Sequence, residues 1–141
     1  MAEARWYHTA TLLYDGRVLV TGGGNSVGDG MLSSAEIWDQ VTGWSSAGDM
    51  STAREDHTAT LLPDGRVLVA GGRNIIGGES VILSSAEIYD PTLGPWTPTG
   101  SMTVERDMHN AVFLPSGGSS KVLMVGGDDP ATAEFFYYPT P

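Results

Sequence analysis

Short runs of alternating hydrophobic and polar residues follow one another along the whole chain. Runs such as "HTATLL" at 8–13 and "RVLV" at 17–20 are rich in threonine, valine and leucine, and glycine, proline or aspartate bounds them. Asp-Gly stands between two such runs at 15–16 and again at 64–65, where we expect a two-residue type I′ turn with positive φ at both positions. No helical periodicity lasts for ten residues. The pattern predicts an all-β fold of short antiparallel strands.

The same strand pattern occurs three times. "ARWYHTATLLYDGRVLVTGGGN" at 4–25 returns as "AREDHTATLLPDGRVLVAGGRN" at 53–74 and more loosely as "ERDMHNAVFLPSGGSSKVLMVGG" at 105–127, and each copy is followed by a block such as "SSAEIWD", "SSAEIYD" or "ATAEFFYY". An internal repeat of about 50 residues is typical of stacked or ring-shaped repeat architectures. We therefore predict one domain over 1–141 with three units at 4–52, 53–104 and 105–141. We call the run "HTATLL" strand A, "RVLV" strand B, the block "AEIYD" strand C and the short stretch at the tryptophan strand D. The third unit lacks the outermost strand, D.

These repeats resemble the kelch family. The likeness is carried by a glycine pair after strand B, an aromatic residue in strand C and a tryptophan in strand D, at Gly22, Gly23, Gly71, Gly72, Gly126, Gly127, Trp38, Tyr89, Tyr137, Trp44 and Trp96. Kelch repeats of about 50 residues form the four-stranded blades of β-propellers. The resemblance implies three blades per chain in a family whose rings most often have six or seven.

Three blades would leave the flat faces of the first and last blades in water. Propeller blades bury both faces against their neighbours, so we expect two chains related by a two-fold axis to close a six-bladed ring. The alternative is that these 141 residues are a piece of a longer propeller. A third possibility is an assembly intermediate that forms a symmetrical ring and binds no ligand.

Composition narrows the classes of partner and chemistry. The chain has 17 acidic and 7 basic residues, a net charge of −10 and no basic cluster, which argues against nucleic acid or a membrane as partner. It has no cysteine, which excludes disulfides, thiolate metal sites and cysteine nucleophiles. No Ser-His-Asp, HExxH or P-loop pattern occurs. We therefore expect a non-catalytic binding module without a cofactor.

The connections between strands differ between the two ends of the units. The A-to-B turns are tight, whereas the B-to-C loops at 25–32, 74–82 and 128–130 vary in length and composition. Variable loops on a rigid scaffold are where binding usually occurs, and aromatic residues there suit protein or carbohydrate ligands. The predicted ligand-binding residues are Trp6, Tyr7, Asn25, Glu55, Asp56, Arg73, Asn74, Asp107 and Asp128.

The stretch "RWYHTATLL" also resembles the strand of galactose oxidase and glyoxal oxidase in which a Tyr-His pair supplies copper ligands. On that likeness Tyr7 and His8 are the metal-ligand candidates. The family site also uses a second histidine and a second tyrosine cross-linked to cysteine, and this chain has no cysteine. Histidine recurs in phase as His8, His57 and His109, so we interpret it as scaffold. The residue before it varies, which leaves Tyr7 available for function.

Two further sets of charged residues recur. Arginine at Arg5, Arg54 and Arg106 matches glutamate at Glu36, Glu87 and Glu134, and we expect buried bidentate pairs that hold strand A to strand C. Together with the histidines, the glycine pairs, Trp44 and Trp96, these are the predicted structural residues. The carboxylates of Glu55, Asp56 and Asp107 are interpreted as a solvated acidic rim, with Ca²⁺ or a cationic ligand as the alternative.

Overall fold

The computed structural model describes residues 1–25, 30–94, 96–115, 121–127 and 132–138. Within these ranges all regular structure is β, so the all-β prediction is confirmed. The sheets are antiparallel, and none of them closes into a barrel. The described residues include no helix that is long and apolar enough to cross a membrane.

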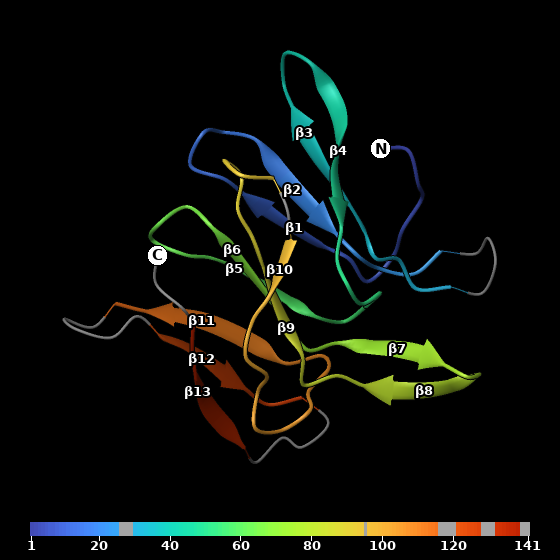
Figure 1. Cartoon of the computed structure of the whole chain (residues 1–141), viewed down its shortest axis with the longest axis vertical. Coiled ribbons are helices and arrows are strands. Elements are labelled where there is room, and N and C mark those ends of the chain that lie inside the picture. Colours follow the sequence, from blue (N-terminus) through green and yellow to red (C-terminus); the bar gives the residue numbers. More distant parts are fainter. Residues whose placement is uncertain (26–29, 95, 116–120, 128–131, 139–141) are drawn as a thin grey trace.

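Three sheets follow one another along the chain (Figure 1). The first has the order β1-β2-β3-β4, with strands at Thr9–Leu12, Val18–Thr21, Ser34–Asp39 and Gly43–Asp49. The second has the order β5-β6-β9-β10, with strands at Thr58–Leu61, Val67–Ala70, Ala86–Tyr89 and Trp96–Pro98. The third has the order β11-β12-β13, with strands at Asn110–Leu114, Lys121–Val125 and Ala133–Tyr137.

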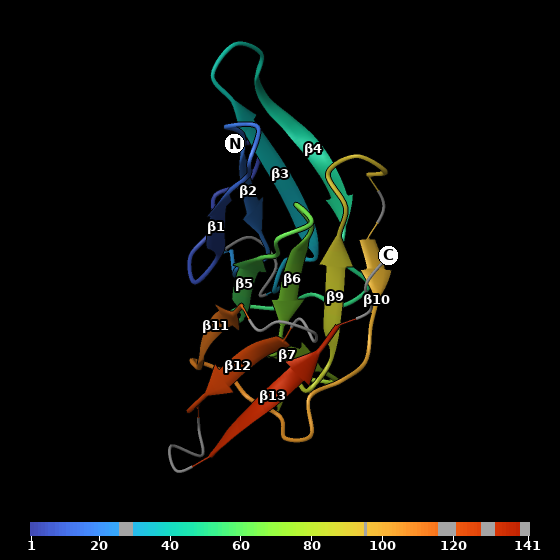
Figure 2. The same ribbon diagram turned by 90° about the vertical axis from the view of Figure 1, so that its left-hand side faces the viewer.

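The second sheet lies between the first and the third (Figures 1 and 2). Strand β5 contacts both β1 and β11, so the first strands of the three sheets lie together at one inner edge. One apolar cluster joins the first sheet to the second, with Leu19 and Ile37 packed on Val67, Val69 and Tyr89. Another joins the second sheet to the third, with Leu68 and Ile88 packed on Val122, Met124 and Phe136. The hydrophobic core therefore lies in two seams between sheets.

The turns after β1 and β5 differ from the expected type I′. Gly16 and Gly65 have φ of 88°, but Asp15 and Asp64 do not have positive φ. The backbone N–H of Leu13 donates to the carbonyl oxygen of Arg17 at 2.8 Å, which leaves a three-residue loop. Asp15 instead accepts a hydrogen bond from the backbone N–H of Arg17. A type I turn followed by a left-handed glycine suits this loop length.

The segment predicted as a loop at 74–82 is largely a hairpin. Strands β7 at Arg73–Ile76 and β8 at Glu79–Ile82 pair with each other, and the hairpin projects from the second sheet (Figure 1). Gly77 and Gly78 at its tip have φ of 64° and 87°, which is the type I′ pattern. The loop between strands B and C therefore has strands of its own, and the Gly-Gly pair between two apolar runs is the signal for this hairpin.

Candidate functional site

Three residues in phase with one another have a left-handed backbone. Tyr7, Asp56 and Met108 have φ of 52°, 54° and 50°, and no other non-glycine residue among the described ones has positive φ. Each stands just before the histidine that leads into β1, β5 or β11. Strained non-glycine positions of this kind cluster at functional sites because surrounding structure must hold them. We call Trp6, Tyr7, Glu55, Asp56, Asp107 and Met108 the mouth residues.

Backbone hydrogen bonds join the mouth residues across the sheets. The N–H of Asp56 donates to the carbonyl oxygen of Tyr7 at 3.1 Å, and the N–H of Met108 donates to that of Asp56 at 2.9 Å. These bonds run from the first sheet to the second and from the second to the third. They hold the three left-handed residues side by side, and the side chains of Tyr7 and Met108 are exposed.

Arg73 neutralises part of the predicted acidic rim. Its Nε lies 3.0 Å from Glu55 Oε1, and its Nη2 lies 3.1 Å from Asp56 Oδ2. Burial alone would lower the pKa of Arg73, but the hydrogen bond with Glu55 and the charges of Asp56, Glu55 and Asp107 raise it overall. Glu55 and Asp107 are themselves buried. The rim is therefore partly buried, in contrast to the solvated rim that was predicted, and Arg73 pairs with two of its three carboxylates.

A cavity of about 430 Å³ lies beside the mouth. Trp6, Gly24, Asn25, Gly30, Met31, Glu55 and Ile75 line it. Trp6 is paired with Gly24 by two backbone hydrogen bonds of 2.9 and 3.0 Å, and its indole stays partly exposed. The Oδ1 atom of Asn25 is buried and accepts no hydrogen bond from any described residue. An exposed indole beside an unused amide oxygen and a carboxylate suits a small polar ligand with an apolar face.

Two of the three in-phase histidines are buried between sheets. The Nε2 atom of His57 lies 3.1 Å from Thr9 Oγ1 and 2.9 Å from Thr21 Oγ1, and that of His109 lies 3.0 Å from Thr58 Oγ1. Burial, with the neighbouring arginine as a smaller cause, lowers the pKa of His57 to about 3 and that of His109 to about 4. In the described part of the chain, no hydrogen bond involves the ring of exposed His8.

These residues do not fit a copper site of the galactose oxidase kind. His57 and His109 use Nε2 on threonine hydroxyls of a neighbouring sheet, which leaves Tyr7 and His8 without a second histidine. The chain has no cysteine for the cross-linked tyrosine. Among the described residues, no group of three or more His, Cys, Asp or Glu side chains is placed to hold a metal ion.

Each recurring arginine lies within its own sheet, against the matching glutamate. The distances are 2.8 Å for Arg5 and Glu36, 3.1 Å for Arg54 and Glu87, and 3.1 Å for Arg106 and Glu134. The pairs are not bidentate as expected, because Nη1 of each arginine donates to two backbone carbonyl oxygens, those of Gly22 and Ser34, Gly71 and Ser85, or Gly126 and Thr132. The second oxygen of each glutamate accepts a backbone N–H, from Ala2, Ser51 or Thr103.

The remaining predicted residues lie apart from this network. Asn74 lies in β7 and its Oδ1 accepts the backbone N–H of Ile75. Asp128 lies outside the described residues. The first glycines of the first two pairs, Gly22 and Gly71, contact the next sheet. Gly23 and Gly72 contact the segment that leads into their own sheet, and their N–H groups also donate to the carbonyl oxygens of Arg54 and Arg106, which precede the next sheet.

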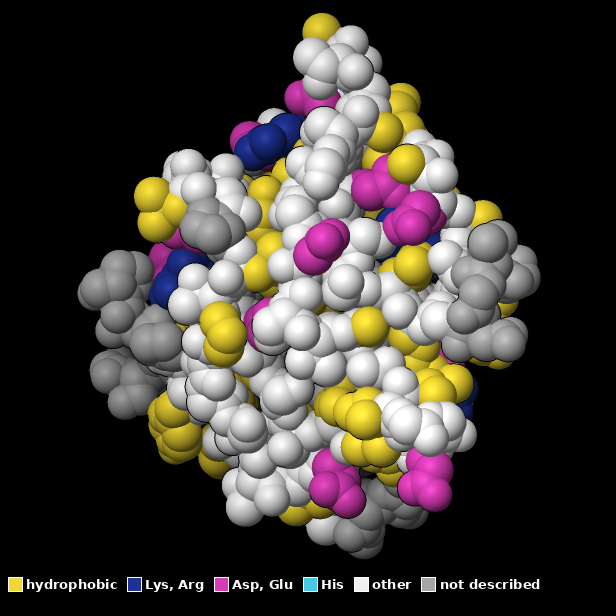
Figure 3. Space-filling model, turned by 45° about the vertical axis from the view of Figure 1, so that its right-hand side comes forward, with side chains coloured by type: hydrophobic (Ala, Val, Ile, Leu, Met, Phe, Trp, Pro, Cys, Tyr) yellow, Lys and Arg dark blue, Asp and Glu magenta, His cyan; other side chains and the backbone are white. Residues whose placement is uncertain are grey.

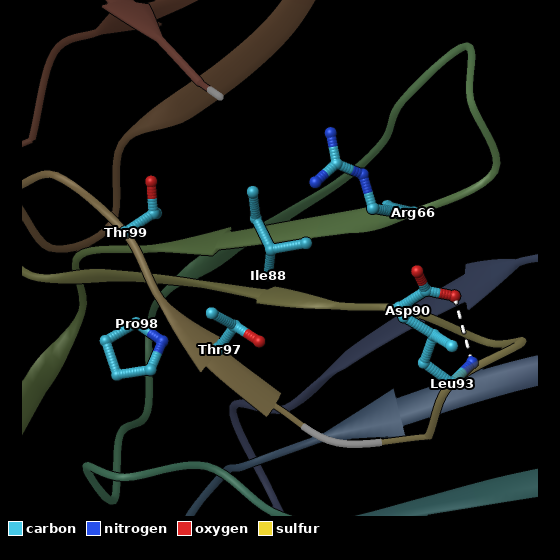
Figure 4. Close-up of a pocket in the computed structure, with 7 residues that line it drawn as sticks. All are labelled: Arg66, Ile88, Asp90, Leu93, Thr97, Pro98 and Thr99. Carbon is cyan, nitrogen blue, oxygen red and sulfur yellow. Dashed lines mark hydrogen bonds between the residues drawn. The ribbon is translucent and has the colours of Figure 1, made fainter. Parts of the chain in front are cut away.

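A small hollow of about 150 Å³ lies on the outer part of the second sheet (Figure 4). Arg66, Ile88, Asp90, Leu93, Thr97, Pro98 and Thr99 line it. At the corresponding place on the first sheet, Trp96 of the second sheet covers the surface and its Nε1 donates to the carbonyl oxygen of Ala47 at 3.0 Å. The third sheet has three strands among the described residues, so no counterpart of Trp96 covers the hollow.

The face of the first sheet that was predicted to be open carries an apolar surface, whose side chains were not predicted from the sequence. Ala10, Val18, Val20, Trp38 and Trp44 line a shallow depression of about 380 Å³ there. Trp38 and Trp44 lie with ring centroids 5.3 Å apart and are 38% and 39% exposed. Alternation along β1 and β2 could have located this surface. On the face that Figure 3 shows, acidic side chains lie in several separate places.

Comparison with known proteins supports the fold. No family model and no curated protein sequence matches the chain. A solved structure that it resembles is a fungal alcohol oxidase of the AA5 family in complex with copper, with a TM-score of 0.74 at 21% sequence identity. That oxidase is a galactose oxidase-like protein with a kelch-type β-propeller. The match covers 96% of this chain but only 31% of the oxidase, so the chain has the fold of part of such a propeller.

Proposed function

We propose that the chain is a non-catalytic propeller module that completes a six-bladed ring with a second copy of itself and binds a protein or carbohydrate at its mouth. In this proposal the three sheets are three blades. The observation that carries it is the apolar surface of the first sheet around Trp38 and Trp44. The corresponding residues of the second sheet, Tyr89 and Trp96, are packed against the first sheet.

The third sheet offers the complementary surface. Phe135, Val125 and Val112 are between 40% and 53% exposed, whereas Ile88 and Ala70, which correspond to Phe135 and Val125 in the second sheet, are buried against the third sheet. Apolar surface of this extent is uncommon on a monomer and marks an interaction site. A ring in which the first sheet of one copy meets the third sheet of the other would bury both surfaces at once.

The ring proposal is tested by the mass of the particle in solution. We expect twice the chain mass of 14.9 kDa at micromolar concentration, measured by light scattering after gel filtration. Apart from Lys121, whose Nζ lies 4.2 Å from the centroid of the Phe135 ring, the side chains named for these faces are uncharged, so the dimer should persist at high salt. A monomer at that concentration would contradict the proposal.

Ligand binding at the mouth is supported by exposed Trp6 and Tyr7 and by the cavity that Trp6 and Asn25 line. We expect a glycan array or an immobilised-chain pull-down to give a ligand whose binding is lost in Trp6→Ala and kept in Tyr14→Ala. Tyr14 is also exposed but lies in the turn between β1 and β2. A clean dimer with no ligand in either assay would favour the ring that binds nothing.

The second candidate is a piece of a longer propeller related to galactose oxidase-like copper oxidases. The observation in its favour is that the chain corresponds to 31% of the solved oxidase. In that case further blades of the same polypeptide would cover the two open faces. Bound copper together with a tyrosyl-radical absorption in the purified chain would support an oxidase role and contradict the non-catalytic proposal.

A further inference from the structure

A methionine stands four residues before each recurring arginine. The three segments are "MAEAR" at 1–5, "MSTAR" at 50–54 and "MTVER" at 102–106. The residues that follow these methionines are also equivalent in the structure. The N–H groups of Ala2, Ser51 and Thr103 each donate to the recurring glutamate of the sheet that follows, at distances of 2.6 to 2.7 Å. Met1 is therefore the counterpart of Met50 and Met102.

Met50 and Met102 fill the same place in the two seams. Both are almost fully buried, at 3% and 4% exposure. A Cβ placed on Gly22 would lie 3.2 Å from the methyl group of Met50, and one placed on Gly71 would lie 2.9 Å from that of Met102. Each methionine thus packs against the first glycine of the pair that follows the second strand of the sheet.

Residues that lead into the next sheet pack against the same glycine from the other side. A Cβ on Gly22 would collide with the carbonyl oxygen of Arg54 and would lie 2.8 Å from the ring of His57. On Gly71 it would collide with the carbonyl oxygen of Arg106 and would lie 2.7 Å from the ring of His109. Each seam therefore contains the first glycine of a pair on one sheet, and we call the space around this glycine a cradle. A methionine, an arginine carbonyl group and a histidine ring fill the cradle.

The third cradle is built but holds none of these groups. Gly126 has φ of 76°, and its N–H donates to the carbonyl oxygen of Thr132 at 3.1 Å, as those of Gly22 and Gly71 do to Ser34 and Ser85. Yet no described atom lies within 4 Å of a Cβ placed on Gly126. The matching groups are at the other end of the chain, where Met1 is 46% exposed and His8 is also exposed.

The third sheet also has a histidine-binding position to which no described histidine bonds. His57 bonds to Thr9 at the start of β1, and His109 bonds to Thr58 at the start of β5. The corresponding residue of β11 is Asn110, which is exposed, and an asparagine amide can hydrogen-bond to an imidazole as a hydroxyl does. The chain therefore carries both halves of one more seam, on its two open sheets.

We propose that Met1, the Arg5 carbonyl group and His8 of one copy occupy the Gly126 cradle of a second copy, with His8 hydrogen-bonded to Asn110. This inference rests on the proposed two-copy ring and assigns its closing contacts. A two-fold axis makes the contact twice, because each copy supplies one cradle and one set of filling groups. The ring then has six seams of one kind.

The test compares Gly126→Ala with Gly94→Ala. Both glycines have positive φ, at 76° and 85°, and both have open space around a Cβ in the isolated chain, so both variants carry similar backbone strain. Only in the proposed seam does the methyl group at 126 meet a carbonyl oxygen and a ring. We expect Gly126→Ala to raise the dissociation constant of the dimer at least tenfold and Gly94→Ala to leave it unchanged, by sedimentation equilibrium.

Three outcomes separate the two proposals. A monomeric parent chain would overturn the ring and the seam together. A dimeric parent with an equally dimeric Gly126→Ala variant would overturn the seam alone. A dimeric parent with a weakened Gly126→Ala variant and an unchanged Gly94→Ala variant supports both.

Methionine oxidation gives an independent measurement. With dilute hydrogen peroxide followed by peptide mass mapping, we expect Met1 of the parent dimer to oxidise as slowly as buried Met50. In Gly126→Ala monomers Met1 should oxidise quickly while Met50 stays protected. Equal, rapid oxidation of Met1 in the parent dimer and in the variant would contradict the contact.

Discussion

The second sheet and the first carry almost the same pattern of side chains, yet one of their corresponding faces is buried and the other is not. Tyr89 is 4% exposed, whereas its counterpart Trp38 is 38% exposed. The same contrast separates the buried ring of His57 from the exposed ring of His8. The pattern within one sheet therefore specifies a seam, and burial depends on whether a neighbouring sheet is present. Repeat proteins have this property because each unit is stabilised by its nearest neighbours.

The largest expected effect comes from the arginine inside a complete seam. Arg54→Ala removes a fully buried guanidinium group from Glu87, which is also buried, and takes one hydrogen-bond donor away from that carboxylate and from each of two carbonyl oxygens. We expect a loss of about 3–5 kcal/mol in the free energy of unfolding, seen as an unfolding midpoint lower by several degrees or more in a thermal melt.

Arg5→Ala is the matched variant on the open side. Arg5 also contacts Glu3, whose side chain is 43% exposed. Water can therefore reach the partners of Arg5 more easily than it can reach the buried pair of Arg54 and Glu87. We expect a smaller loss, roughly 1–3 kcal/mol. Equal losses at Arg5 and Arg54 would show that the neighbouring sheet contributes nothing to the network. Exposed Arg17→Ala, which breaks a surface pair with Asp15, should change stability by less than about 1 kcal/mol.

The next largest expected effect is the difference in unfolding free energy between Tyr89→Ala and Trp38→Ala. Tyr89→Ala opens a cavity in the seam where Tyr89 packs on Trp96 at a centroid distance of 5.1 Å. We expect it to cost about 3 kcal/mol in urea unfolding. Trp38→Ala should cost no more than about 1 kcal/mol in monomers and should instead weaken self-association. A large stability loss in Trp38→Ala at a concentration where it is monomeric would contradict the seam interpretation.

Acid should weaken the complete seams through their histidines. The pKa of His57 is lowered to about 3 and that of His109 to about 4, so near pH 5 the unfolded chain takes up protons that the folded chain does not. Stability from each ring is therefore present above about pH 6.5 and is lost as the pH falls. We expect a loss of about 2 kcal/mol per histidine between pH 7.5 and pH 5, measured by urea unfolding.

The variant His57→Gln isolates this effect from the carboxylates, which titrate at lower pH. Glutamine stays neutral, so the slope of stability against pH between 7.5 and 5 should fall by about half. An unchanged slope in His57→Gln would show that the buried ring is not the group that titrates.

The strands and the repeat phase could be predicted from the sequence because both are local. Alternation in "HTATLL" and "RVLV" marks β1 and β2, and an arginine matched to a glutamate, as Arg54 is to Glu87, occurs in all three units. The phase of Met1 with Met50 was also present in the sequence. Its meaning required the structure, since a methionine becomes a seam residue only once the glycine that it covers is known.

The conformation of the mouth could not be predicted. Tyr7, Asp56 and Met108 share a left-handed backbone, but no glycine or asparagine signals it, because the hydrogen bonds that stabilise it come from neighbouring sheets. The pairing of Arg73 with the acidic rim was missed for the same reason, since the contact of Arg73 with Asp56 joins the hairpin to the segment before β5. Interactions between distant segments leave no periodic trace in the sequence.

The smallest expected effect concerns that strained backbone. Met108→Gly removes the Cβ that disfavours a φ of 50° at this position, and Met108 is exposed, so little packing is lost with its side chain. We expect a gain of about 0.5–1 kcal/mol relative to Met108→Ala in urea unfolding, since alanine keeps the Cβ and also lacks the long side chain. Val112→Gly against Val112→Ala is the control in an ordinary strand position of the same sheet, where glycine should instead cost stability. If glycine is no better than alanine at 108, the left-handed backbone carries no strain there, and its recurrence in all three units then reflects only the hydrogen bonds that join one sheet to the next.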